Sequence, residues 1–328
     1  MTPAPAHNIM VLYTGGTIGM QASANGLAPA SGFEQRMREQ LDGQAGLAAW
    51  QFRELLPLID SANMTPYYWQ RLRAEIIDAV HGQGCDGVLV LHGTDTLAYS
   101  AAAMSFQLLG LAAPVLFTGS MLPAGVPDSD AWENLTGALQ VLTQGTESGV
   151  QVYFHGQLLA PNRTAKVRSF GRHPFVTLAR LGGAAQAPIP PALDYRQPLQ
   201  EANIAVLPLV PGFGAALLLA ALDSGAQGLV LECFGSGTGP CDDAAFVAAL
   251  EQAHARGVVV VAITQCHEGG VQLDVYEAGS RLRQAGVLSG GGMTREAVFG
   301  KLQVLLGSGL PVEDVRRLVE LDLAGELR

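Results

Sequence analysis

The sequence predicts a two-domain α/β protein, with a larger N-terminal domain on a mainly parallel sheet and a smaller C-terminal α/β domain. Nearly continuous apolar runs such as Val258–Ile263 are typical of strands buried on both faces. Segments of helical period, about 10–15 residues long, alternate with these runs, which indicates parallel βαβ units. The proline-rich stretch Ala187–Gln200 has neither the spacing of apolar residues typical of a helix nor that of a strand. We therefore place the larger N-terminal domain at residues 1–186, a linker at 187–202 and the second domain at 203–328.

The elements follow from these periodicities. The predicted strands are short apolar runs: Ile9–Tyr13, Gly87–Leu91, Val115–Thr118, Val150–Phe154, Ile204–Leu209, Leu229–Glu232 and Val258–Ile263. The predicted helices have apolar residues at helical spacing: Phe33–Leu41, Pro66–His81, Leu97–Leu109, Ala131–Leu142, Ala215–Leu222, Ala244–Ala255, Arg295–Leu306 and Val312–Leu321.

Composition excludes several classes of protein. Of 328 residues, 48% are hydrophobic and 15% are charged, against about 25% charged in an average protein. Such a chain is not intrinsically disordered. Its 40 glycines have no three-residue period, which excludes collagen. The glycine content instead predicts a compact protein with many tight turns.

Charge and cysteine content bear on partners and location. A net charge of −10, with no basic stripe, argues against nucleic acid as a partner. The longest apolar stretch, around Phe213–Leu222, is too short to span a membrane. The four cysteines (Cys85, Cys233, Cys241 and Cys266) have no paired spacing and are predicted to be buried, reduced thiols. With no signal-type N-terminus, we expect a cytoplasmic protein.

Three loops that follow predicted strands combine glycine with hydroxyl side chains. Ligands of parallel sheets bind outside the carboxyl ends of the strands, so these loops are the place to look for a site. They are Thr14–Thr17, His92–Thr96 and Thr118–Ser120.

Most familiar chemistries fail on spacing. The dinucleotide pattern GxGxxG is broken at Gly15 and at Gly235, and Gly300-Lys301 is not part of a P-loop. There is no HExxH zinc motif, and Ser236 lacks the first glycine of a GxSxG elbow. Cys266 is next to His267 in sequence only.

Threonine chemistry survives these tests. A threonine hydroxyl needs a base to act as a nucleophile, and a lysine serves if its amine is kept neutral or passes its proton through a relay. Thr94 is adjacent to Asp95, and Lys166 follows the predicted strand Val150–Phe154. The plainer interpretation makes the threonines and Asp95 helix N-caps, and Lys166 a surface lysine.

The residues at these positions resemble the bacterial-type L-asparaginases. Tyr13–Gly19 (YTGGTIG) resembles the first signature of that family, and Leu91–Leu97 (LHGTDTL) resembles the second. The cytosolic type I branch fits best. The similarity covers nearly the whole chain, through Asp60–Pro66, Thr118–Ser120, Asn162–Lys166, Thr264–Cys266 and Gly291–Thr294.

The resemblance implies hydrolysis of L-asparagine, a small-molecule substrate, to L-aspartate and ammonia. Thr17 matches the family's nucleophile, and Thr94, Asp95 and Lys166 match its relay. The resemblance implies an acyl-enzyme, a homodimer or tetramer, and no metal or organic cofactor.

It also implies a set of substrate-binding positions. Ser61 and the backbone at Ala62 match the segment that receives the α-carboxylate, and Asp95 matches the holder of the α-ammonium group. The backbone carbonyl of Ser120 faces the amide nitrogen in the family, and Thr94 belongs to the same substrate-binding set.

Two departures from the family pattern concern the substrate site. Leu27 stands where the family commonly has a tyrosine that interacts with the nucleophile, and Tyr67 or Tyr68 is a candidate replacement. Ala62 replaces a glutamine or serine, which removes a side-chain contact to the substrate.

Two more departures lie in the C-terminal half. Thr238 replaces an asparagine that reaches a neighbouring subunit's site. Glu232 replaces the arginine of members with an effector pocket, and an acid there would repel an effector's carboxylate, so we expect no activation by asparagine.

Two alternatives stay open. One is an amidase of similar architecture acting on glutamine, a D-amino-acid amide or misacylated tRNA, the last disfavoured by the acidic charge. The other is a non-catalytic amino-acid-binding protein, for which Leu27 is the main argument.

Overall fold

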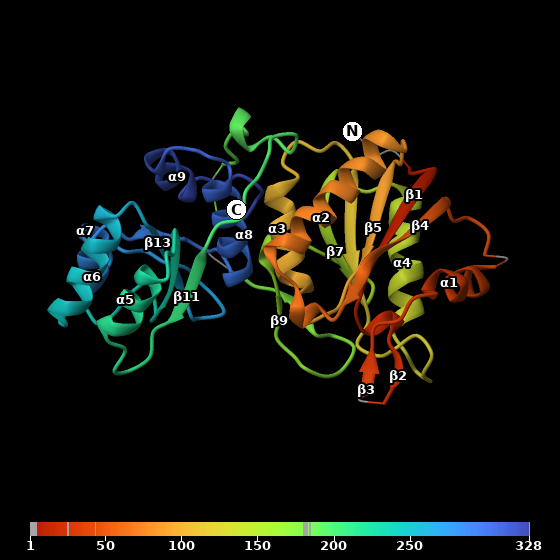
Figure 1. Ribbon diagram of the computed structural model, residues 1–328, viewed down its shortest axis with the longest axis horizontal. Coiled ribbons are helices and arrows are strands. Elements are labelled where there is room, and N and C mark those ends of the chain that lie inside the picture. The colour runs from red at the N-terminus through yellow and green to blue at the C-terminus, as the bar shows by residue number, and fades with distance from the viewer. Residues whose placement is uncertain (1–4, 25, 43, 180–182, 184, 328) are drawn as a thin grey trace. The chain divides into compact units, whose positions relative to one another are not determined.

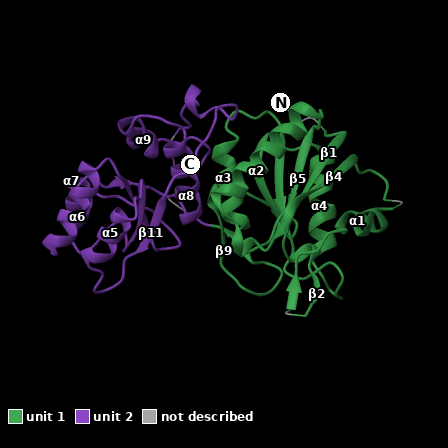
Figure 2. Cartoon of the chain, in the orientation of Figure 1, with its two compact units in different colours: residues 1–177 green, residues 178–328 purple. Residues whose placement is uncertain are grey.

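The computed structural model describes residues 5–24, 26–42, 44–179, 183 and 185–327. The chain divides into two compact units, residues 1–177 and 178–328 (Figures 1 and 2). The stretch predicted as a linker, 187–202, falls in the second unit and contains a 3-10 helix at Pro191–Leu193.

The first unit is organised around a six-stranded sheet in the order β4-β1-β5-β6-β7-β8. In this order, the first five strands (β4, β1, β5, β6 and β7) are all parallel to one another. The last strand, β8, is antiparallel to β7. In sheet order they span Ala49–Ile59, Asn8–Gly15, Gly87–Leu91, Pro114–Thr118, Gly149–Phe154 and Gln157–Leu159.

Within the described residues, two antiparallel strand pairs and four α-helices complete this unit. The pairs are β2 (Gln21–Ser23) with β3 (Gly26–Ala28), and β9 (Thr164–Lys166) with β10 (Phe175–Thr177). The helices, seen around the sheet in Figure 1, are α1 (Phe33–Leu41), α2 (Pro66–Ile77, continued by a π-helical turn at Asp78–Gly82), α3 (Leu97–Gln107) and α4 (Ala131–Gln144).

The second unit has a parallel sheet in the order β11-β12-β13-β14. These strands span Ile204–Pro208, Gly228–Cys233, Val259–Thr264 and Leu288–Ser289. Its helices are α5 (Ala215–Asp223), α6 (Ala244–Ala255), α7 (Glu277–Gln284), α8 (Arg295–Gly307) and α9 (Val312–Val319).

The predicted fold class is confirmed, because the strands read as buried runs lie inside parallel sheets. Every residue of β5, β12 and β13 is buried. The predicted strands and helices lie where the structure has them, with differences at their ends.

Two of the elements that prediction missed, β4 and α7, have weak periodicity. The strand β4 reads AWQFRELLPLI, with charged residues and a proline inside it, because it is an edge strand with a partly exposed face. The helix α7 reads EAGSRLRQ and buries only Gly279 and Leu282 among its residues. Both lack the apolar pattern that identified the other elements.

One cysteine prediction is wrong. Cys85, Cys233 and Cys241 are buried, but Cys266 is exposed. The strand β13 ends at Thr264, so Cys266 lies beyond the buried run, in the turn that follows it.

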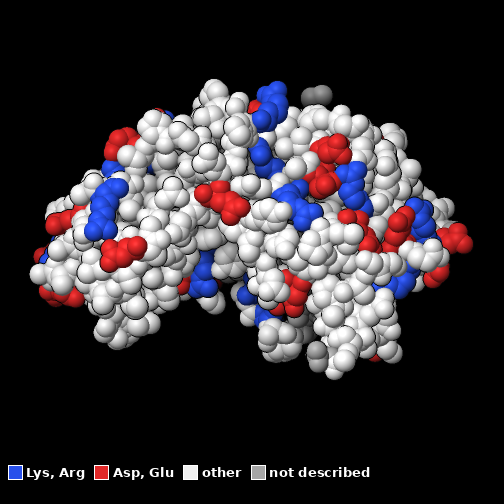
Figure 3. Space-filling view, in the orientation of Figure 1, with Lys and Arg blue, Asp and Glu red and all other residues white. Residues whose placement is uncertain are grey.

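The surface carries scattered charge. On the face drawn in Figure 3, acidic and basic side chains are interspersed on a largely uncharged surface. Within the described residues, no helix is both long and apolar enough to cross a membrane.

A buried ion pair holds the C-terminal segment of the second unit. The Lys301 ammonium lies 2.6 Å from a Glu326 carboxylate oxygen, with side chains 1% and 0% exposed. Lys301 also donates to the carbonyls of Val319 and Leu321, and Glu326 accepts from the backbone N–H of Leu323. The residues after α9 are therefore fixed by polar groups that have no access to water.

Replacing Lys301 tests this anchor. Lys301→Met leaves the Glu326 carboxylate buried without its cation, so the free energy of unfolding falls by about 3–5 kcal/mol. Urea denaturation followed by circular dichroism measures the change. Arg317→Met, which removes an exposed ion pair with Asp314, is the control and changes stability little. Equal effects of the two substitutions contradict the anchoring role.

Candidate active site

Four neighbouring strands of the first sheet end at the loops that carry the predicted site residues. Ser61 follows β4, Thr17 follows β1, Thr94 and Asp95 follow β5, and Ser120 follows β6. Because β4, β1, β5 and β6 are adjacent and parallel, their carboxyl ends lie along one edge of the sheet. The topology thus places all five residues at the edge where ligands of such sheets bind.

Glycines let three of these loops approach each other. Gly16 has a φ of 81°, and a Cβ added to it would lie 2.4 Å from the backbone of Gly93. A Cβ on Gly93 would in turn lie 2.5 Å from the Ser61 hydroxyl oxygen. Only glycine fits at both positions, so the backbone next to Thr17 touches the backbone next to Thr94.

Hydrogen bonds fix the same loops to one another. The Thr96 hydroxyl donates to the Ser61 carbonyl at 2.8 Å, and the Thr14 hydroxyl donates to the Leu91 carbonyl at 3.0 Å. Thr96 occupies the N-cap position of α3 without making a side-chain capping bond. The hydroxyl that capping would use therefore connects two loops of the site instead.

Lys166 joins the two residues that follow β5. Its ammonium donates to the Thr94 hydroxyl at 2.9 Å and to an Asp95 carboxylate oxygen at 2.6 Å. The Lys166 side chain is 17% exposed, whereas that of Asp95 is 64% exposed. A hydroxyl, an amine and a carboxylate thus form a continuous chain along which a proton can move.

Thr17 begins a 3-10 helix that spans Thr17–Gly19. Thr17 is half-buried, and within the described residues no hydrogen bond of its hydroxyl is found. The 3-10 turn is closed by the Met20 N–H, which donates to the Thr17 carbonyl at 3.1 Å. The structure thus places Thr17 beside the Thr94 loop through Gly16 but does not bond it to Thr94, Asp95 or Lys166.

The other predicted substrate-binding positions differ in exposure. Ser61 is buried, and Ala62 is exposed with its N–H donating to an Asp60 carboxylate oxygen at 3.1 Å. Ser120 is buried, and its hydroxyl donates to the Leu122 carbonyl at 2.6 Å. The Ser120 side chain is therefore engaged within its own loop.

Two polar residues at the start of α4 shape the loop after β6, and sequence reasoning did not single them out. The buried Asp130 carboxylate accepts from the N–H groups of Met121 and Leu122. The buried Asn134 amide donates to the Gly119 carbonyl at 3.0 Å. The available signal was an aspartate directly before a predicted helix, which ordinarily means an N-cap.

His92 lies fully buried under the loop that carries Thr94. Its Nδ1 is 2.8 Å from the Gly93 carbonyl oxygen, and its Nε2 is buried without a partner. Burial lowers the pKa of His92 to about 4, so the ring stays neutral near pH 7. Across the described part of the chain, no three His, Cys, Asp or Glu side chains gather as a metal site would require.

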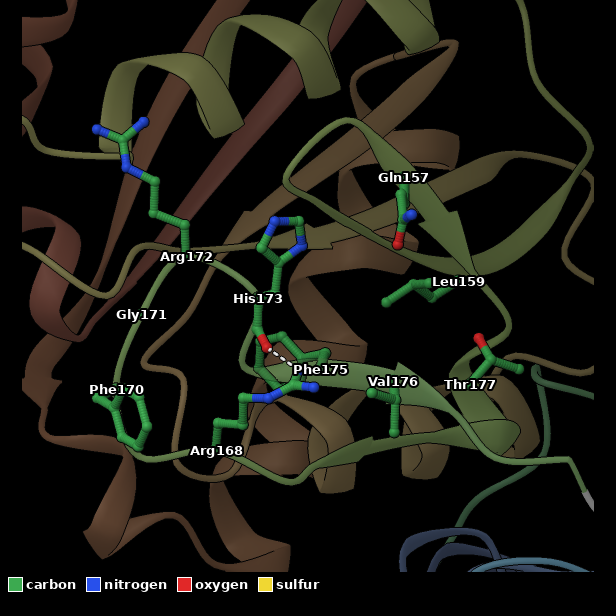
Figure 4. A pocket seen from close by; sticks show the side chains of 10 residues that line it. All are labelled: Gln157, Leu159, Arg168, Phe170, Gly171, Arg172, His173, Phe175, Val176 and Thr177. Carbon is green, nitrogen blue, oxygen red and sulfur yellow. Dashed lines mark hydrogen bonds between the residues drawn. The ribbon is translucent and has the colours of Figure 1, made fainter.

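A hollow of about 550 Å³ lies against the segment between β9 and β10 (Figure 4). None of the predicted site residues lines it. Two hydrogen bonds fold this segment back on itself. The Val167 N–H donates to the Pro174 carbonyl. The Arg168 guanidinium donates to the His173 carbonyl, which is the dashed line in Figure 4. These bonds brace the strand pair whose last β9 residue is Lys166.

The positions that depart from the family pattern can be placed as well. Leu27 lies on β3 and is 55% exposed. Tyr67 and Tyr68 begin α2, with Tyr67 54% exposed. Glu232 ends in a buried carboxylate that pairs with Arg295 at 2.8 Å.

Comparison with known proteins gives the class. The family model for the N-terminal part of asparaginases matches residues 8–186, and the model for the glutaminase/asparaginase C-terminal domain matches residues 203–319. The chain belongs to the asparaginase family.

Similar individual proteins of this family are named L-asparaginases. The chain is 36% identical to L-asparaginase 1 of Escherichia coli strain K12 over 334 residues, which covers 98% of each protein. It is similar to the solved thermostable L-asparaginase from Thermococcus kodakarensis, with a TM-score of 0.85, 32% identity, and coverage of 98% and 99%. It is also similar to L-asparaginase I from Vibrio cholerae, with a TM-score of 0.84, 31% identity and the same coverage.

The buried neutral state of His92 predicts a pH dependence of stability. An unfolded histidine takes up a proton below about pH 6.5, whereas folded His92 stays neutral down to about pH 4. Stability is therefore lost as pH falls, by about 2 kcal/mol between pH 7 and pH 5. Urea unfolding at the two pH values measures this loss. His92→Gln removes that part of the slope and the exposed-site control His7→Gln does not; a slope unchanged in His92→Gln would show that the pKa of His92 is the same in the folded and unfolded states.

Proposed function

We propose that the chain is an L-asparaginase of the cytosolic type I kind, hydrolysing L-asparagine to L-aspartate and ammonia. The observation that supports this most is the Thr94–Lys166–Asp95 chain of hydrogen bonds, at the carboxyl end of the sheet where Thr17 also lies. The family membership and the full-length likeness to proteins named L-asparaginase support the same substrate.

In the proposed first step, the Thr17 hydroxyl oxygen attacks the side-chain amide carbon of asparagine. The C–N bond breaks, the Thr17 proton leaves with the amide nitrogen as ammonia, and an aspartyl ester forms on Thr17. The unpartnered hydroxyl of Thr17 suits this role, because no hydrogen bond within the described residues has to be broken for it to attack.

In the second step, water cleaves the ester. Lys166 first passes a proton to the Asp95 carboxylate, and its neutral amine then takes the proton of Thr94 as Thr94 takes one from the attacking water. Collapse of the tetrahedral intermediate returns a proton to the Thr17 oxygen and frees aspartate. The distances of 2.9 and 2.6 Å from Lys166 to Thr94 and Asp95 suit the two transfers in which Lys166 takes part.

The substrate's charges match the groups at the sheet edge. The exposed carboxylate of Asp95 would hold the α-ammonium group, and Ser61 with the backbone at Ala62 would receive the α-carboxylate, which would take the place of Asp60 as acceptor of the Ala62 N–H. The Ser120 carbonyl would accept from the amide nitrogen, and Thr94 would border the reacting carbon. Fixing a zwitterion at both ends orients the amide for attack.

Two features of the proposal rest on the family resemblance. A cytoplasmic location and a homodimer or tetramer remain predictions. Glutamine or another amide is the alternative substrate, because one methylene changes binding by only about 1–3 kcal/mol. A non-catalytic amino-acid-binding protein is the second candidate, favoured by the exposed apolar Leu27 where the family has a tyrosine.

Ammonia release from asparagine, glutamine and their D-forms tests the proposal. Thr17→Ala and Lys166→Met each lower kcat on asparagine by about 10²-fold or more, because each removes a group that acts in the transition state. Thr177→Ala, an exposed threonine of the first unit, is the control and keeps full activity. Undiminished turnover in Thr17→Ala overturns the nucleophile assignment. Amino-acid binding in a calorimeter without turnover of any amide favours the binding protein.

The Glu232–Arg295 pair predicts simple kinetics. A free guanidinium would attract an effector's carboxylate, but the Arg295 guanidinium is already engaged by the buried Glu232. We therefore expect the rate to depend hyperbolically on asparagine concentration, as initial rates over a wide range will show. A sigmoidal curve that substitution of Glu232 or Cys266 abolishes would refute this.

A further inference from the structure

Arg36 of α1 is hydrogen-bonded to the turn that carries Thr17. Its guanidinium Nη2 donates to the carbonyl of Gly19 at 3.0 Å. Gly19 is the last residue of the 3-10 helix that starts at Thr17. One hydrogen bond therefore connects a helix outside the sheet to the far end of the nucleophile's turn.

Tyr13 supports the same turn from inside the unit. Its side chain is fully buried, and a Cβ added to Gly19 would lie 1.9 Å from the phenol oxygen. The Gly19 backbone thus rests directly on the Tyr13 hydroxyl, which leaves no room for a side chain. Burial raises the pKa of Tyr13 well above its usual range, so the phenol stays neutral and acts through contact and hydrogen bonding.

Arg36 and Tyr13 contact the chain at the two ends of the β2–β3 hairpin. The hairpin leaves the turn after Gly19 and returns at Ala30, whose carbonyl accepts from the Tyr13 hydroxyl at 3.4 Å. Two residues further on, the Gly32 N–H donates to a Glu54 carboxylate oxygen at 2.8 Å. The strands of the hairpin are themselves mostly exposed, so its position depends on these end contacts.

Arg36 is held in place by stacking. Its guanidinium lies 4.9 Å from the centre of the Phe33 ring, which contacts the Tyr13 ring at 5.4 Å. The Arg36 Nε is buried without a hydrogen-bond partner. A buried donor without a partner has lost its hydrogen bond to water, which costs free energy. Placing the Arg36 guanidinium against the Gly19 carbonyl therefore has an energetic cost at Nε.

We propose that Arg36, together with Tyr13, positions the turn that carries Thr17, so that the Thr17 oxygen lies at attacking distance from the substrate. This inference rests on the proposed function, in which Thr17 is the nucleophile. Arg36 does not touch the substrate; it acts through the Gly19 carbonyl. A displacement of about 1 Å at a reacting group can cost about 10²-fold in rate, so one hydrogen bond at this place matters for turnover.

The packing of α1 does not depend on the Arg36 guanidinium. The helix α1 is packed through its buried residues Phe33, Met37 and Leu41, which do not depend on the Gly19 hydrogen bond. Arg36→Met keeps an aliphatic stem over Phe33 and removes only the guanidinium. We therefore expect the variant to fold, with the change confined to the turn.

The experiment compares Arg36→Met, Arg36→Lys and the control Arg38→Met. Arg38 lies on the same helix and pairs with Glu34 at the surface. We expect Arg36→Met to lower kcat on L-asparagine at least about tenfold, because the nucleophile's turn is displaced. KM should change less than about threefold, and the calorimetric Kd for L-aspartate should stay the same, because the groups that bind the charged ends of the amino acid are on other loops. Arg36→Lys should recover part of the rate, and Arg38→Met should match the wild type.

Hydrogen exchange provides a readout that does not depend on activity. Amides of residues 18–20 should exchange faster in Arg36→Met, and Tyr13→Phe, which loses only the hydroxyl, should speed exchange at residues 30–32. An unchanged kcat in Arg36→Met overturns the proposal, as does a fall in kcat matched by equal weakening of aspartate binding. Absence of ammonia release by the wild type would instead overturn the proposed function, and the exchange data would still decide whether Arg36 holds the turn.

Discussion

The close contact between the loops after β1 and β5 is the constraint on which the site depends. Gly16 and Gly93 meet at a distance that excludes any side chain, and Gly93 in turn lies against Ser61. The strands β4, β1 and β5 set the spacing of these loops, and their parallel register brings the loop residues to the same edge. The glycine content of the chain therefore acts partly at the site, where backbone replaces side chains and brings Thr17 next to the Thr94 loop.

Much of the fold follows from local pattern. Buried parallel strands such as β5 and β13 are continuous apolar runs, and they are identified because both of their faces lie in the core. The edge strand β4 and the polar helix α7 were missed for the opposite reason, since a partly exposed element has no such run. The class of fold is thus predictable from the elements that make the core, whereas polar elements such as β4 and α7 are not identified.

The site was predictable to the extent that its residues sit directly after strands. Thr94 and Asp95 belong to such a loop, but Lys166 lies on β9, outside the main sheet, and only the folded chain brings its ammonium to them. Asp130 and Arg36 had no signal of function, because each acts on a backbone group far from it in the sequence or in a neighbouring loop. A side chain that bonds to a backbone group in another loop leaves no periodic pattern in the sequence by which it could be identified.

In the proposed first step, the Thr17 hydroxyl has to lose its proton as it attacks. Leu27 is apolar, and Tyr13 is a neutral buried phenol whose hydroxyl donates to Ala30. Of the two lysines in the sequence, Lys301 is buried against Glu326 in the second unit. Lys166 is bonded to Thr94 and Asp95, and none of these three groups is bonded to Thr17 in the part of the chain that the structure describes. Under the proposed function, the position of the Thr17 turn relative to the substrate therefore determines how well the hydroxyl oxygen can attack.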